Sequence, residues 1–109
     1  MRTRKFFYTA QVIRWVDGDM VDVELDLGFR VYSRQRLRLL GVDTPERGQD
    51  GFHEATDFCD GKAKPGTIIE VNSHSSGKFG RWLAIIYIPG EQASLNDQLI
   101  ARGLAREYN

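Results

Sequence analysis

The sequence lacks several features that would place it in a special class of protein. It has one cysteine, Cys59, among 109 residues, so an internal disulfide is excluded and the fold does not depend on an oxidising compartment. Lysine and arginine (15) balance aspartate and glutamate (15), which gives a formal net charge of zero. A general attraction to polyanions is therefore excluded, and binding to nucleic acid would need a local basic patch.

Long apolar runs are also missing. No stretch approaches the ~20 apolar residues that span a bilayer, so no membrane partner is expected. The N-terminus carries basic residues before its aromatics, but Gln11 and Arg14 interrupt it too early for a signal peptide. We expect a cytoplasmic protein unless a leader was removed before residue 1. The length suits one domain over residues 1–109, and we expect a monomer.

What the sequence does contain is a series of short alternating segments that predict β-strands. Residues 20–27 alternate, with Val21, Val23, Leu25 and Leu27 on one face and Asp22, Glu24 and Asp26 on the other. Similar patterns predict strands at residues 6–16, 20–27, 30–40, 67–73 and 81–88. A loop is expected over residues 41–51.

Two helices are predicted between and after the strands. One covers residues 52–59 and is stopped by Asp60-Gly61; the other begins after Ser94 as N-cap and ends at Gly103. Five strands and two helices in this length predict a mainly β, α+β fold: a five-stranded barrel of the oligonucleotide-binding (OB) type with packed helices.

The candidate site comes from three separated segments. The segment LRLLGVDTPE places Arg38, Asp43, Thr44 and Glu46 at a strand end and in the following loop. Asp19 comes from the segment VDGD before it, and Arg81 from FGR after it. The candidate site therefore consists of Asp19, Arg38, Asp43, Thr44, Glu46 and Arg81. Carboxylates hold hard divalent cations, a carboxylate can serve as general base, and guanidinium groups pair phosphate oxygens. This combination predicts a metal-dependent phosphodiesterase site.

Four segments in the same order resemble the staphylococcal nuclease (thermonuclease) family: VDGDMVDV, LRLLGVDTPE, KFGRWLAIIY and SLNDQLIARGLA. The resemblance implies the five-stranded barrel and a calcium-dependent nuclease that cleaves DNA and RNA to 3′-phosphate ends with little sequence preference. It implies that Asp19 and Asp43 bind Ca²⁺ through carboxylates and Thr44 through its carbonyl. Glu46 would be the general base, and Arg38 and Arg81 would contact the scissile phosphate.

The chain departs from the family pattern at several positions. Met20 stands where the family usually has threonine, and Phe79 replaces a tyrosine before the Gly-Arg pair. The hairpin between Asp19 and Arg38 is longer than in the type member, and the stretch from Glu46 to Arg81 is shorter. The chain stops at Asn109, where the family usually continues into another helix. An alternative is therefore a catalytically silent OB-fold module that binds nucleic acid or protein.

Simpler interpretations of individual residues remain open. Asp17-Gly18-Asp19 alone is typical of a turn. The acidic face of residues 22–26 is expected to pair across the hairpin with Arg34 and Arg36, although these arginines could also contact a nucleic-acid backbone. Cys59 is expected to be a small buried group, while Trp15 and Trp82 are expected in the core or at the barrel rim. His53 and His74 lack ligand spacing and are expected on the surface or in loops.

Overall fold

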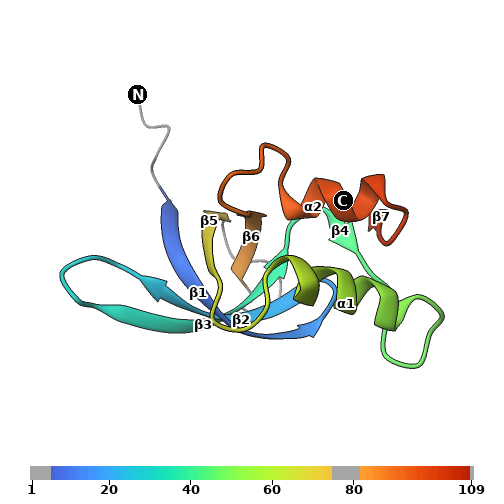
Figure 1. The fold of residues 1–109 in the computed structure, drawn as a ribbon, viewed down its shortest axis with the longest axis horizontal. Coiled ribbons are helices and arrows are strands. Elements are labelled where there is room, and N and C mark those ends of the chain that lie inside the picture. The colour runs from blue at the N-terminus through green and yellow to red at the C-terminus, as the bar shows by residue number, and fades with distance from the viewer. Residues whose placement is uncertain (1–5, 75–81, 109) are drawn as a thin grey trace.

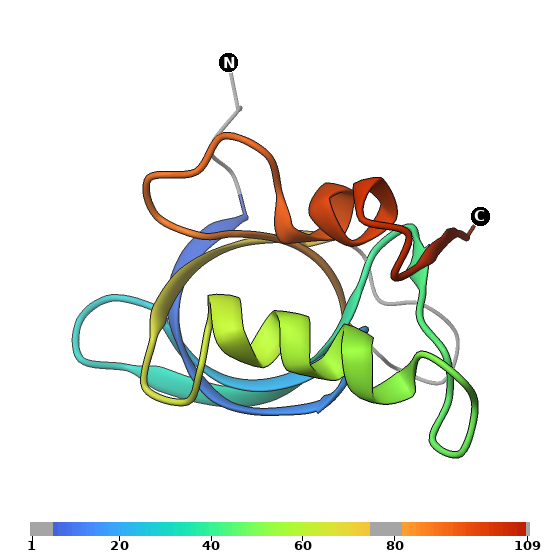
Figure 2. The same ribbon diagram turned by 45° about the vertical axis from the view of Figure 1, so that its right-hand side comes forward.

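The predicted five-stranded barrel is present in the structure, a computed structural model that describes residues 6–74 and 82–108. Its strands are β1 (Phe7–Asp17), β2 (Met20–Asp26), β3 (Tyr32–Leu39), β5 (Ile68–His74) and β6 (Trp82–Tyr87). They pair in the order β1-β2-β3-β6-β5, and β5 closes the ring onto β1. All these pairs are antiparallel except β3 with β6. Figure 2 shows the strands as a closed ring.

The long strand β1 allows the barrel to close. It pairs with β5 through its first half, at residues 7–11, and with β2 from Thr9 to Asp17. Its register with β2 shifts between Val12 and Arg14 and again between Trp15 and Asp17. Such irregularities increase the local twist and bend a strand, which lets β1 serve two neighbours.

Alternating residues of the strands fill the barrel. Four of these residues are at most 2% exposed: Val21 and Val23 of β2, and Leu37 and Leu39 of β3. Val21 pairs directly with Leu37. Leu27, predicted on the same apolar face, is instead 43% exposed because β2 ends at Asp26 and Leu27 lies in the hairpin turn. The alternation in the sequence therefore predicts the buried face of β2 correctly for Val21 and Val23.

Helix α1 (Phe52–Lys62) lies across one end of the barrel (Figure 2). It buries Phe52, Ala55 and Cys59, and the Trp15 indole Nε1–H donates to the Ala63 carbonyl over 2.9 Å. The predicted stop at Asp60-Gly61 is wrong, since the helix continues to Lys62 and the Ala63 amide closes the last turn on the Cys59 carbonyl. A helical glycine costs only about 1 kcal/mol, which the packing of this helix outweighs.

Helix α2 (Leu95–Ala101) follows the prediction at both ends. The Ser94 Oγ accepts a hydrogen bond from the Asp97 amide over 3.0 Å, as an N-cap should. After Arg102, Gly103 takes a φ of 73°, and the Leu104 amide donates to the Leu99 carbonyl. Glycine is favoured at this left-handed position, which explains why the helix ends here.

A second small sheet was not predicted. Strand β4 (Val42–Asp43) lies within the expected loop and pairs antiparallel with β7 (Arg106–Glu107) near the C-terminus. The Tyr108 amide extends this pairing by donating to the Gly41 carbonyl over 2.9 Å. Figure 1 shows β4, β7 and α2 together at one side of the barrel, while the β2–β3 hairpin projects on the other.

Among the described residues, neither helix has the length and apolar character needed to cross a bilayer.

Candidate active site

The site begins at the tight turn between β1 and β2. Asp19 is only 7% exposed there, and its amide donates to the Asp17 Oδ1 over 3.2 Å. Burial raises the pKa of the Asp17 carboxyl to about 7, and the hydrogen bond and charge of Asp19 add to this increase. A second carboxylate this close disfavours the charged form of Asp17, so a nearby cation would stabilise the turn.

Asp19 and Asp43 converge on one guanidinium. Arg38 Nη2 lies 3.4 Å from the Asp19 Oδ2 and 3.5 Å from the Asp43 Oδ1. The Thr44 amide also donates to the Asp19 Oδ2, over 3.2 Å. Four of the predicted residues are therefore in direct contact, although they come from the β1–β2 turn, β3, β4 and the segment after β4.

Arg38 is held on several sides. Its Nη1 donates to the Val42 carbonyl over 3.2 Å, and its Cζ lies 5.0 Å from the centre of the Tyr108 ring. The side chain is only 16% exposed. A guanidinium stacked on an aromatic face and bonded to a backbone carbonyl has little freedom, so its remaining N–H groups have a fixed direction.

The β4–β7 pair contributes two residues that sequence reasoning missed. Arg106 Nη2 lies 3.4 Å from the Asp43 Oδ2, and Tyr108 stacks on Arg38. Both follow the last segment of the family resemblance, which ends at Ala105. A strand of two residues is too short to show alternation in the sequence. Only the pairing of Arg106 and Glu107 with Asp43 and Val42 shows that this segment borders the site.

Glu46 shares a hollow with Asp43 and Thr44. The cavity measures about 670 Å³, and residues 103–106 form its other side. The Glu46 amide donates to Gln49 Oε1 over 2.8 Å, and the Gln49 amide donates back to the Glu46 carbonyl over 2.9 Å. This local turn fixes the backbone, while in the described part of the chain no hydrogen bond holds the exposed Glu46 carboxylate.

The sixth predicted residue, Arg81, and the predicted departure at Phe79 lie outside the described residues. The described residues include no group of three or more His, Cys, Asp or Glu side chains that could hold a metal ion. The oxygen atoms that do meet, at Arg38, belong to the carboxylates of Asp19 and Asp43, and Thr44 adjoins Asp19 through its amide. The buried Thr44 Oγ1 has no hydrogen-bond partner among the described residues. An all-oxygen set with two carboxylates fits a hard cation that keeps several water ligands.

Several residues that we expected to lie outside the site form contacts elsewhere. Arg36 Nε lies 2.7 Å from the Asp22 Oδ1, and Arg34 Nε lies 3.5 Å from the Glu24 Oε2, so the predicted cross-hairpin pairs are confirmed. Cys59 is fully buried; its Sγ donates to the Gly18 carbonyl, and burial raises the pKa of its thiol far above the usual range. A thiol in this state is no nucleophile.

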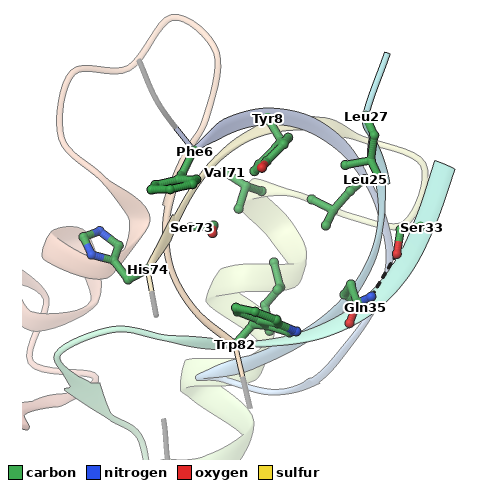
Figure 3. A pocket seen from close by; sticks show the side chains of 11 residues that line it. Phe6, Tyr8, Leu25, Leu27, Ser33, Gln35, Val71, Ser73, His74 and Trp82 are labelled. Atoms are coloured by element: carbon green, nitrogen blue, oxygen red, sulfur yellow. Dashed lines mark hydrogen bonds between the residues drawn. The ribbon is translucent and has the colours of Figure 1, made fainter. Parts of the chain in front are cut away.

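A second cavity lies in the open end of the barrel, away from these carboxylates. It measures about 440 Å³ and is largely apolar, with Tyr8, Leu25 and Val71 pointing into it and Trp82 at its edge (Figure 3). Trp82 is 44% exposed, which agrees with the predicted rim position, whereas Trp15 belongs to the core. His74 also borders the cavity, and its buried Nε2 has no hydrogen-bond partner among residues 6–74 and 82–108.

A small closed five-stranded barrel with packed helices is the OB type of α+β fold. In this chain, acidic and guanidinium groups gather at one edge of the barrel. The family model for staphylococcal nuclease homologues matches residues 36–109, and the chain belongs to this family.

Three relatives show how far the similarity extends. The chain is 32% identical over 105 residues to a thermonuclease of Staphylococcus hyicus, with 90% of this chain and 58% of the relative covered. It is 30% identical over 101 residues to an uncharacterized endonuclease of Escherichia coli O157:H7, covering 91% and 60%. An uncharacterized protein of Methanocaldococcus jannaschii is 29% identical over 128 residues, covering 93% and 59%. The chain thus spans about three fifths of the length of these relatives.

Proposed function

We propose that the protein is a metal-dependent nuclease that hydrolyses phosphodiester bonds of DNA, RNA or both with little sequence preference. The supporting observation is that one arginine, Arg38, contacts the carboxylates of both Asp19 and Asp43. A nuclease site needs acidic oxygens and a phosphate-binding cation at the same point. The nuclease names of two relatives, the thermonuclease and the endonuclease, agree with this proposal.

The proposed metal is Ca²⁺, bound by the Asp19 and Asp43 carboxylates and the Thr44 backbone carbonyl. Bound there, the ion would neutralise charge on the phosphate and act as a Lewis acid. The two carboxylates that meet at Arg38 offer only oxygen atoms, which supports a hydrated hard cation at this point.

The two arginines are proposed to bind the scissile phosphate. Arg38 Nη2 contacts both carboxylates in this structure, and a phosphate would accept the N–H groups that now point at Asp19 and Asp43. Arg81, which precedes β6, is proposed as the second phosphate ligand on the strength of the family resemblance. Guanidinium groups stay charged and pair two oxygens at once, which suits the charge that grows in the transition state.

Glu46 is proposed as the general base. It lines the same hollow as Asp43 and Thr44, and its exposed carboxylate forms no hydrogen bond with the residues that the structure describes, so it is available to accept a proton from the attacking water. By family resemblance the products would carry 3′-phosphates. General-base catalysis of this kind contributes roughly 10²–10⁴ in rate.

Replacing the proposed base tests the mechanism. We expect Glu46→Gln to lower the hydrolysis rate of single-stranded DNA by roughly 10²-fold or more, while its affinity for the same DNA stays close to that of wild type. Glu54→Gln, which removes an exposed carboxylate from α1, is the matched control and should retain full activity.

Two results would count against the assignment. Equal rates for Glu46→Gln and Glu54→Gln would remove Glu46 from the mechanism. A wild-type protein that binds DNA but leaves it intact would favour the alternative, a catalytically silent binding module.

A further inference from the structure

The β2–β3 hairpin carries a row of arginines that leads straight to the site. Tyr32, Arg34, Arg36 and Arg38 alternate along β3 with Ser33, Gln35 and Leu37, which line the barrel cavity. The four therefore share the outer face of the strand, and successive members are about 6.7 Å apart along it. The last of them, Arg38, is the arginine that contacts both carboxylates of the site.

The acidic side chains of β2 pair with Arg34 and Arg36 but leave both guanidinium groups accessible to a ligand. Arg34 and Arg36 side chains remain 76% and 51% exposed, although each pairs with a carboxylate. Arg34 uses only its Nε in this pair, and a guanidinium has five N–H donors, so several stay available. The hairpin, residues 20–39, carries four arginines against three carboxylates: Arg30, Arg34, Arg36 and Arg38 against Asp22, Glu24 and Asp26.

The tip of the hairpin has a conformation and an exposure that cost stability. Phe29 and Arg30 both adopt positive φ, at 55° and 61°, a region where non-glycine residues are strained. The Phe29 side chain is 100% exposed, and Val31 and Tyr32 beside it are more than half exposed. Asn-Gly would make the same turn without strain, so the fold alone gives no reason for an aromatic residue here.

We propose that the β2–β3 hairpin is an arm that binds single-stranded nucleic acid running away from the site. The guanidinium row along β3 would contact successive phosphates, and Phe29 and Tyr32 would stack on unpaired bases. This proposal rests on the proposed function in one respect, namely that the strand also contacts Arg38. Alternating positive charge and aromatic surface is the usual composition of single-strand binding sites, whereas a paired base offers no free face to Phe29.

Binding of two labelled oligodeoxythymidylates tests the arm: one of about three nucleotides, which reaches only the site, and one of about twelve. Fluorescence anisotropy is measured with chelator present, so that no hydrolysis occurs. Wild type should bind the longer probe much more tightly. Phe29→Asn should weaken binding of the longer probe by about fivefold or more and leave the shorter probe almost unaffected. Asparagine tolerates positive φ, so the thermal midpoint of this variant should not fall.

A charge variant gives an independent readout. Arg34→Gln should reduce the slope of log affinity against log salt for the longer probe by about 0.7, the value for one phosphate contact to a single strand. Lys64→Gln removes the same charge from an exposed position outside the hairpin and should leave the slope unchanged.

The arm is refuted if both Phe29→Asn and Arg34→Gln bind the longer probe as wild type does. It is also refuted if Phe29→Asn abolishes binding to anionic phospholipid vesicles and has no effect on the oligonucleotide. Hydrolysis by wild type is measured separately. Tight, Phe29-dependent binding without hydrolysis would overturn only the proposed function, and hydrolysis without Phe29-dependent binding would overturn only the arm.

Discussion

At the scale of single residues, the position of Asp19 depends on close packing around Gly18. A Cβ atom at Gly18 would lie 2.8 Å from the Ala55 Cβ of α1 and 3.0 Å from the Thr44 Cγ2. Thr44 in turn holds the Asp19 carboxylate through its amide. The absence of a side chain at Gly18 therefore lets the turn, the helix and Thr44 meet, and this contact fixes one proposed metal ligand.

This packing predicts the effect of adding one methyl group. Gly18→Ala should lower the free energy of unfolding by about 1–3 kcal/mol, because the new Cβ meets two atoms of the folded core. Gly61→Ala is the matched control: Gly61 is helical, and a Cβ there has no neighbour within 4 Å, so its free energy of unfolding should stay the same or rise. Urea denaturation followed by circular dichroism measures both, and equal values would contradict the packing argument.

At the scale of elements, the side chain of the buried Asn96 forms hydrogen bonds between α2 and the barrel. The Asn96 Oδ1 accepts from the Ile86 amide over 3.0 Å, and its Nδ2 donates to the carbonyls of Leu40 and Ala84 over 2.9 and 3.0 Å. Asn96 is 4% exposed. These bonds join α2 to β6 and to the residue that links β3 with β4, so they hold the segment from which Arg38 and Asp43 extend.

We therefore expect Asn96→Ala to be strongly destabilising. It leaves one amide and two carbonyls without this partner, and a single buried unsatisfied group costs about 1–3 kcal/mol, so the unfolding free energy should fall by at least that amount. Asp97→Ala changes the neighbouring, exposed residue of the same helix and should cost less than about 1 kcal/mol. A thermal melt in which the two variants coincide would show that Asn96 does not anchor α2.

At the scale of the whole molecule, alternation in the sequence predicted the barrel, because its strands are half-buried and at least six residues long. The sequence also predicted α2, because Ser94 and Gly103 mark the two ends of this helix. The β4–β7 pair and the last turn of α1 escaped prediction because tertiary contacts, not local pattern, decide them. The contact of Asp19, Arg38, Asp43 and Thr44 followed from the family resemblance; Arg106 and Tyr108, which complete their surroundings, come from a segment with no motif.

The whole molecule also has two distinct ends (Figure 1). The acidic and guanidinium groups gather where β4, β7 and α2 meet, and the arginine-bearing hairpin projects on the other side of the barrel. Because the formal net charge is zero, only such local arrangements can attract a polyanion.

The most direct test of the central claim is hydrolysis of single-stranded DNA by the wild-type protein with Ca²⁺, Mg²⁺, Mn²⁺ or chelator as the only variable. We predict cleavage with Ca²⁺ and none with chelator, because Asp19, Asp43 and Thr44 would bind the ion through oxygen atoms alone. Cleavage that continues undiminished in chelator, or DNA that stays intact with every metal, would contradict this claim.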